Sequence, residues 1–449
     1  MKKTLLGAIA IVLVGLLYYF TIGSKQITQE IKKGVNSVIL ELSSNGFTTN
    51  KKELTPTKEH IEIELNNTQK IEDLLKSKGF EDIDKEQLLA LQGAIIGIDL
   101  IYNPSPTKAV AMDIYPIKLP TLLQEYIQNS SQKEIKKSIE EILKNKTVLV
   151  HIEINKLATA FEGYLKDINI DNEIKVLGFK FNGGLEPRSK DSIKFINETI
   201  DMIELKSTED NILFKLLNLK ANIKNPLDEP NKKSKFSIEL LEMKNILLGE
   251  ESSLIAKNIK GESFNRVGVN SLIDGKLILN VSELNASSKK ESQEIIFKDL
   301  DLVFSIKNSD MKLFKQFNNM DKMSNDKALE EFQKFFQALA KDKFQMEIEK
   351  LSVADIILNK NELKGFELKA TLFLDDSIDI SALNANNIFD AFNIKLNIEA
   401  SNELISAISN NPNAMVIMMI LQPIDKNGKK VYNIEYSKGS LKINGKPFL

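Results

Sequence analysis

The chain has 449 residues, with 60 basic and 62 acidic side chains, a formal net charge of −2 and no cysteine. The balanced charge and the presence of only two arginines, Arg188 and Arg266, argue against a nucleic-acid partner, since arginine makes the commonest bidentate contacts with phosphates and bases. The missing cysteines exclude thiolate catalysis, disulfides and cysteine-ligated metals, and two histidines leave little for general-base chemistry.

The segment Leu5–Ile22 is uncharged and almost wholly apolar, with Lys2 and Lys3 before it and Lys25 after it. About 20 apolar residues form a helix of roughly 30 Å, which crosses a bilayer, so residues 1–23 are expected to be an uncleaved signal anchor. A cleaved signal peptide and a buried helix are the alternatives; the small-x-small site at Thr21–Gly23 is poor. Because lysines flank this segment on both sides, the charges leave its orientation in the membrane undecided. Export of the domain that follows is the usual outcome for an N-terminal anchor.

Residues 24–164 are expected to mix helices and strands. Apolar spacing predicts that a helix continues to about Leu42, that Thr68 caps a second helix, and that Lys85–Gln92 and Pro120–Lys144 are helical. The predicted strands are Phe47–Leu54, Glu59–Leu65, Ala94–Tyr102, Ala109–Ile117 and Val148–Ile154. The turn at Asn103–Pro106 predicts that the third and fourth strands pair as a hairpin.

Residues 165–308 have the alternating pattern of a β-rich region. The predicted strands are Leu177–Phe181, Ile193–Leu205, Ile212–Ile223, Phe236–Leu247, Leu254–Ile259, Gly268–Leu272, Lys276–Val281 and Ile295–Ile306. Asp274-Gly275 has the composition of a two-residue hairpin turn.

Residues 309–449 begin with two predicted helices, 310–319 and 326–342, which are expected to cover a sheet. The phenylalanines in and beside these helices could fill an apolar groove on that sheet; they are Phe314, Phe317, Phe332, Phe335, Phe336 and Phe344. The strands predicted next are Gln345–Leu351, Ala354–Leu358, Phe366–Leu374 and Ile394–Ala400, followed by a helix over Ser401–Ser409, apolar core at Ala414–Leu421, and a hairpin of Val431–Tyr436 and Ser440–Ile443. The whole pattern predicts an α+β, β-dominated fold: an N-terminal transmembrane helix, then a long curved antiparallel sheet with covering helices.

The sequence singles out no catalytic, cofactor-binding or metal-ligating residue, and we expect no cofactor. His60 and His151 each stand in the sequence His-Ile-Glu-Ile, which places His and Glu on the same face of a strand. If these two strands were neighbours, two histidines and two glutamates would gather as metal ligands do. The alternative is a solvated face with ordinary cross-strand pairs.

Two asparagines, Asn66 and Asn285, stand in Glu-Leu-Asn-x-Ser/Thr sequences. This extended pattern resembles the acceptor of bacterial periplasmic N-glycosylation, so glycosylation of Asn66 or Asn285 is an open hypothesis.

Three stretches carry a family resemblance: Tyr432-Asn-Ile-Glu-Tyr436 continuing to Asn444-Gly445-Lys446-Pro447 at the end, Asn45-Gly46-Phe47 near the start, and Ile306-Lys-Asn308-x-Asp310 between them. Together they resemble the YdgA-like family of bacterial envelope proteins, a family of unknown function. The arginine that precedes Gly-Phe in that family is absent here. The resemblance implies a single-pass inner-membrane protein with a large periplasmic domain, with a homodimer as an open alternative, and implies no catalytic residue.

Two functions remain open. The favoured one is a membrane-anchored periplasmic protein, not an enzyme, with a binding or scaffolding role toward an envelope protein. The other is a lipid-binding or lipid-transfer protein with an apolar groove on a curved sheet. A lipid carrier needs an apolar face that its own side chains leave unfilled, whereas a scaffold packs its helices there.

Overall fold

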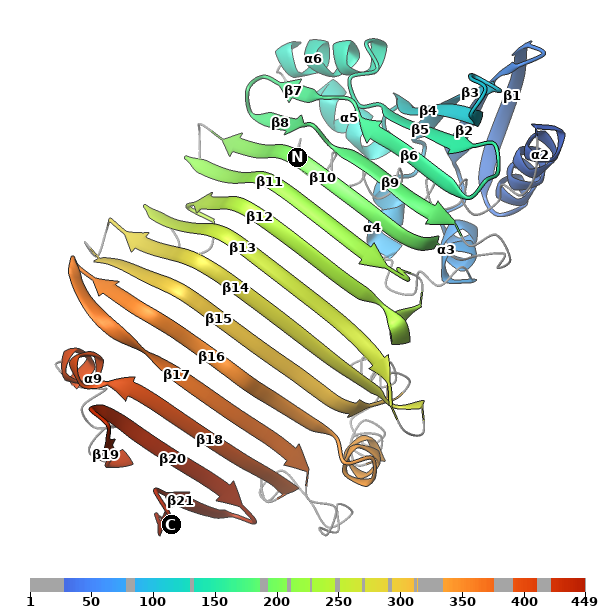
Figure 1. The fold of residues 1–449 in the computed structure, drawn as a ribbon. Helices are drawn as coiled ribbons and strands as arrows, with labels where there is room; N and C mark the ends of the chain where they lie inside the picture. The colour runs from blue at the N-terminus through green and yellow to red at the C-terminus, as the bar shows by residue number, and fades with distance from the viewer. Residues whose placement is uncertain are drawn as a thin grey trace. The chain divides into compact units, whose positions relative to one another are not determined.

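The computed structural model describes residues 28–77, 85–129, 133–185, 193–207, 211–226, 228–246, 251–268, 271–289, 293–310, 313, 334–374, 391–409 and 421–448. This part of the chain is β-dominated, with a large, long antiparallel sheet and few helices, which confirms the coarse fold class (Figure 1). The predicted anchor Leu5–Ile22 lies outside the described residues. Among those that are described, no helix is long and apolar enough to cross a membrane.

The chain divides into two compact units. The N-terminal unit comprises Met1–Ser207 and Leu219–Leu227, and the C-terminal unit comprises Thr208–Asn218 and Asp228–Leu449. Strand β11 (Ile212–Lys224) contributes residues to both units.

The N-terminal unit is an antiparallel meander. Its elements are α2 (Thr28–Ser44), β1 (Phe47–Thr55), β2 (Lys58–Leu65), α3 (Thr68–Ser77), α4 (Lys85–Ala90), β3 (Ile95–Tyr102), β4 (Lys108–Lys118), α5 (Thr121–Asn129), α6 (Lys133–Lys144), β5 (Val150–Asn155), β6 (Ala160–Leu165), β7 (Ile168–Ile170), β8 (Ile174–Leu177), β9 (Lys180–Leu185) and β10 (Ile193–Ser207). Strands β1 to β6 pair in chain order. Strand β6 then pairs with β9, β7 with β8, and both β8 and β9 with β10.

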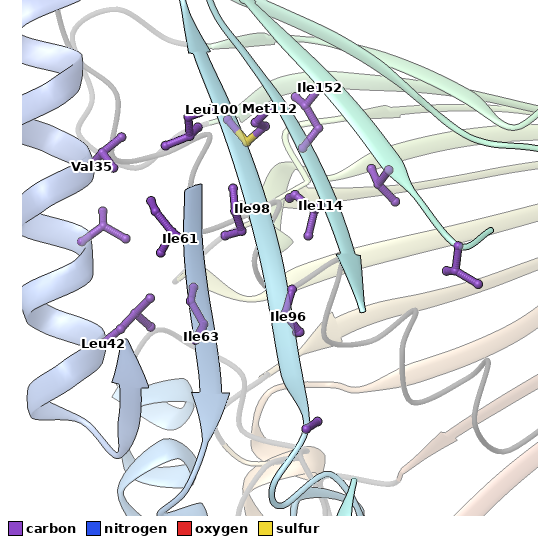
Figure 2. Packing of buried hydrophobic residues seen from close by; sticks show 14 of the residues in the cluster. Val35, Leu42, Ile61, Ile63, Ile96, Ile98, Leu100, Met112, Ile114 and Ile152 are labelled. Carbon is purple, nitrogen blue, oxygen red and sulfur yellow. The ribbon is translucent and has the colours of Figure 1, made fainter. Parts of the chain in front are cut away.

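One face of this sheet forms the core of the unit (Figure 2). The alternation predicted for β2 puts Ile61 and Ile63 on that face, both 0% exposed, beside the equally buried Ile98 of β3. Helix α2 packs Val35, Val38 and Leu42 against the same cluster. Full burial of each such side chain contributes about 1.5–3 kcal/mol, so the amphipathic face of α2 is held on the sheet by its apolar contacts.

The helical region predicted over Pro120–Lys144 contains two helices, α5 and α6. Two local expectations for this unit need correction. The cap of α3 is Asn67, whose Oδ1 accepts a 3.1 Å hydrogen bond from Lys70 N, and Thr68 is the first helical residue. The strand predicted over Leu177–Phe181 is divided into β8 and β9, because Gly178 has φ +65 and a side chain there would collide with Asp201. Strands β6 and β7 were not predicted.

The C-terminal unit is a second meander of longer strands (Figure 1). Its elements are 3-10 helix η1 (Glu229–Asn231), β12 (Lys233–Lys244), β13 (Ser252–Val267), β14 (Ile273–Ser288), β15 (Gln293–Ser309), β16 (Gln345–Leu358), β17 (Asn361–Leu374), β18 (Phe392–Ser401), α9 (Asn402–Ser409), β19 (Ile424–Lys426), β20 (Lys429–Ser437), β21 (Ser440–Ile443) and β22 (Lys446–Pro447). Strands β12 to β18 pair in chain order. Strand β20 pairs with β18 and also with β19 and β21, and β22 pairs with β21.

The turn between β13 and β14 is not where the sequence predicted it. Asp274-Gly275 lies inside β14, opposite Arg266 and Asn265, and Arg266 forms a 3.1 Å ion pair with Asp274. Strand β13 ends at Val267 and β14 begins at Ile273, and Gly268 N donates a 2.7 Å hydrogen bond to Leu272 O. The described residues of the strand predicted over Gly268–Leu272, which are 268, 271 and 272, are therefore not in a strand. The strands predicted separately as Gln345–Leu351 and Ala354–Leu358 form the single strand β16.

Residues in the left-handed region interrupt the alternation in several long strands. Asp299 in β15 has φ +51, as does Asn258 in β13. The interruption lets Phe297 and Leu300 share one apolar cluster although they are three positions apart. The left-handed residue therefore lets β15 place apolar side chains on the same face on both sides of Asp299.

Candidate functional site

The two histidines lie in one cross-strand row on the face of the N-terminal sheet opposite the core. His60 is opposite Asp99, Asp99 is opposite Asp113, and Asp113 is opposite His151. Two strands therefore separate the histidines, so they do not gather at one point. Among the described residues, no group of three or more histidine, cysteine, aspartate or glutamate residues is arranged to hold a metal ion.

Each histidine is paired with carboxylates through both ring nitrogens. Nδ1 of His60 lies 2.7 Å from Asp99 Oδ1, and Nδ1 of His151 lies 2.6 Å from Asp113 Oδ1. Nε2 of each ring is 3.5 Å from the glutamate two residues on, Glu62 or Glu153. The hydrogen bond with Asp113 raises the pKa of His151 above its ordinary value, against the opposing effect of burial. These are the contacts of a polar sheet face, as the simpler interpretation expected.

The surface most distinctive in composition is one face of the C-terminal sheet, here called the apolar face. It contains a row of directly opposed side chains, Leu279, Leu302, Leu351, Leu368, Ile398 and Tyr432, from β14 to β18 and β20. A parallel row contains Leu277, Phe304, Ile348, Ala370, Leu396 and Ile434. Apart from the buried Tyr432, these side chains are only half-buried.

The described helices that pack on the apolar face do so at its two ends. At one end, Leu404 and Ile405 of α9 join Val353, Ile356 and Ala400. At the other end, the helical residues 334–341 contribute Phe335 and Leu339, which pack with Phe344 and Leu374. The predicted cover helix 326–342 is thus confirmed over 334–341 and covers one end of the face.

Other parts of the predicted cover, Phe314, Phe317 and Phe332, fall outside the described residues, as do residues 414–420 of the predicted apolar core. Leu313 is helical, and its backbone N donates a 3.4 Å hydrogen bond to Asp310 Oδ1, as expected at the start of the helix predicted over 310–319.

The opposite face of the C-terminal sheet carries ion pairs, two between strands and one along β17. Lys276 Nζ lies 2.6 Å from Glu349, Lys350 lies 2.7 Å from Asp301, and Lys369 lies 2.9 Å from Glu367. The hydrogen bond from Lys350 holds the pKa of Asp301 below its ordinary value. Charged side chains favour exposure of this face to solvent, so the two faces of the same sheet differ sharply in polarity.

Tyr432 breaks the apolar character of the rows. Its side chain is 4% exposed, and its hydroxyl oxygen is buried with no hydrogen-bond partner in the described part of the chain. Burial also raises its pKa. An unpaired buried hydroxyl costs about 1–3 kcal/mol, so an acceptor that reached this atom would gain a hydrogen bond. Sequence reasoning missed Tyr432, because only the register shows that it shares the face of Ile398.

The two extended glycosylation patterns occupy different settings. Asn66 is exposed between β2 and α3, and its Nδ2 donates a hydrogen bond to Thr48 Oγ1. Asn285 lies inside β14 between Ile255 and Ile296, and its Nδ2 donates a 2.9 Å hydrogen bond to Glu294. Of the two, Asn66 is the accessible one, and its modification stays a prediction.

The chain matches no family model, and no curated protein or solved structure matches it. The resemblance to the YdgA-like family therefore stays a prediction from the motifs that carry it.

Proposed function

We propose that this protein is a membrane-anchored component of a bacterial envelope, not an enzyme, whose C-terminal sheet binds the acyl chains of lipids along the apolar face. The single observation that supports this function is the pair of half-buried apolar rows that cross six strands between the two end clusters. The proposal includes anchorage through Leu5–Ile22 in the inner membrane, with the large domain in the periplasm.

Three features favour acyl chains as the occupant. The rows contain aliphatic and aromatic side chains without a charge, which suits a hydrocarbon chain and no polar ligand. Six strands at about 4.8 Å spacing span about 24 Å from first to last, comparable with an extended acyl chain. The pairing of β15 with β16 and of β16 with β17 contains register shifts, which bend strands, so we expect the face to be curved. The unpaired Tyr432 hydroxyl would donate to an ester or headgroup oxygen.

The test is photocrosslinking of the full-length chain with a diazirine-bearing phospholipid in membranes. We expect Leu302→Asp to reduce crosslinking about tenfold, equal to about 1.4 kcal/mol, because a carboxylate would interrupt the apolar row. The matched control is Val303→Asp, one residue along β15 and on the opposite face, where crosslinking should stay at the wild-type level. Equal crosslinking of the two variants would contradict lipid binding at this face.

The second candidate is a scaffold that holds envelope proteins or a second copy of this chain. It is favoured by the end clusters, where the chain's own helices already fill part of the face. Native mass spectrometry of the gently solubilised protein separates the two functions. Bound phospholipid supports lipid binding, and a lipid-free chain in complex with protein supports the scaffold.

A further inference from the structure

Three hairpin turns of the N-terminal unit lie at the end of the sheet where α2 begins. They are residues 54–58, 103–107 and 156–159, and together they are called the rim. Helix α2 runs antiparallel to β1, with Lys51 Nζ donating a 2.7 Å hydrogen bond to Asn36 Oδ1. Near the start of α2, Lys32 Nζ donates a 3.2 Å hydrogen bond to Pro56 O. The first turns of α2 therefore contact the first turn of the rim.

The three turns are joined side by side. Tyr102 N, next to the second turn, donates a 2.8 Å hydrogen bond to Thr57 O of the first. Lys156 N of the third turn donates a 3.0 Å hydrogen bond to Thr107 O of the second. The rim is thus one continuous surface fixed by backbone hydrogen bonds.

The rim exposes large apolar side chains beside lysines. Leu157 is 79% exposed, more than any other large apolar side chain in the described part of the chain, and Leu54 is 54% exposed. Lys58 is exposed on the first turn, and Lys156 precedes Leu157. Apolar side chains that enter the acyl boundary, with lysines near anionic headgroups, are the composition of a membrane-interface contact.

The short distance between the rim and the predicted anchor indicates that the partner of the rim is the lipid bilayer. Five residues, 23–27, separate Ile22 from Thr28, where the described chain begins. Six Cα-to-Cα steps of at most about 3.6 Å extend no more than roughly 22 Å. An anchor in the bilayer therefore keeps the start of α2, and the rim beside it, close to the headgroups.

We infer that the rim is a bilayer-contact surface, with Leu54 and Leu157 inserted at the headgroup boundary and Lys58 among anionic headgroups. This inference rests on the proposed membrane anchorage and is independent of lipid binding by the C-terminal sheet. The contact sets the orientation of the N-terminal unit on the membrane, in addition to the tether that the anchor provides.

The absence of cysteine makes a labelling experiment direct. The full-length variants Leu54→Cys and Leu157→Cys carry a fluorophore in vesicles of phosphatidylcholine and phosphatidylglycerol that contain a headgroup-nitroxide lipid. The matched control is Leu122→Cys, an equally accessible leucine, 62% exposed, just beyond the other end of β4. The 11 residues of β4 span about 35 Å, which places the control beyond reach of the quencher.

We expect the nitroxide to quench labels at 54 and 157 about twofold or more, and the label at 122 little, since interfacial side chains lie within about 5–10 Å of the headgroup boundary. Weak or equal quenching at all three positions, in chains that float with the vesicles, would overturn the rim contact and leave the anchorage standing. Chains that do not float would overturn both. Because the leucines are exposed, thermal unfolding of the three labelled variants should match that of the wild type.

Discussion

The hydroxyl of Tyr102 donates a 2.7 Å hydrogen bond to Oε2 of Glu59, a carboxylate only 2% exposed at the edge of the N-terminal core. Lys51 Nζ lies 3.0 Å from the same oxygen, and Lys32 Nζ lies 3.4 Å from Oε1. Since Lys32 belongs to α2, this buried charge connects the helix nearest the predicted anchor to strands β1, β2 and β3. Burial opposes ionisation of Glu59, but the three donors outweigh it and hold its pKa below the ordinary value.

Replacement of this carboxylate should weaken the attachment of α2. We expect Glu59→Gln to lower the free energy of unfolding of the N-terminal unit by about 2 kcal/mol, since two lysines lose their buried partner. The measurement is chemical denaturation followed by circular dichroism. Glu62→Gln, on the same strand but on the opposite face and only half-buried, is the control. A loss equal to that of the control would show that apolar packing alone holds α2.

His151 should make the N-terminal unit less stable as the pH rises. Its pKa is raised by Asp113, so its contribution to stability is fully present below about pH 6.5, the ordinary value, and is lost as pH rises through the raised value. Melting temperatures (Tm) measured from pH 5.5 to about pH 8.5 should therefore fall more for the wild type than for His151→Gln. Parallel curves for the two proteins would contradict a native-state charge on this ring.

Removal of the Tyr432 hydroxyl should have opposite effects on stability and on lipid binding. We expect Tyr432→Phe to raise the unfolding free energy of lipid-free protein by about 1 kcal/mol, because an unpaired buried hydroxyl is removed. The same change should reduce phospholipid crosslinking, since a donor to the lipid is lost. Tyr436→Phe, on the same strand and face, is the control. If crosslinking is unchanged, the hydroxyl does not contact lipid.

Gly365 in β17 should not tolerate a side chain. A Cβ atom there would lie 1.9 Å from the backbone oxygen of Val353, so β16 and β17 would have to separate. We expect Gly365→Ala to cost about 2 kcal/mol, seen as a lower midpoint in urea. Gly275→Ala in β14 is the matched control, because its nearest neighbour is a side-chain oxygen, Asn265 Oδ1, at 3.3 Å. Similar midpoints for the two variants would mean that the strands adjust freely.

Local patterns allowed much of the architecture to be predicted. The helical spacing up to Leu42 predicts α2, and the alternation around Ile61 and Ile63 correctly gives the buried face of β2. The hairpin of β3 and β4 was also predicted, because turn residues and flanking strands are adjacent in the chain. The alternation of apolar and polar residues along the strands likewise predicted that the sheet has one apolar and one polar face.

Only the tertiary structure decided which residues share a row. His60 and His151 stand in identical local sequences, yet two strands separate them, and no local property of either strand encodes that order. The turn expected at Asp274-Gly275 failed because cross-strand pairing with Arg266 and Asn265 outweighs a two-residue preference. The apolar face depends in the same way on Asp299, whose left-handed backbone lies between Phe297 and Leu300, two side chains of one apolar cluster. Sequence determines local periodicity, whereas register is set by contacts between strands, and the candidate lipid surface is a property of the register.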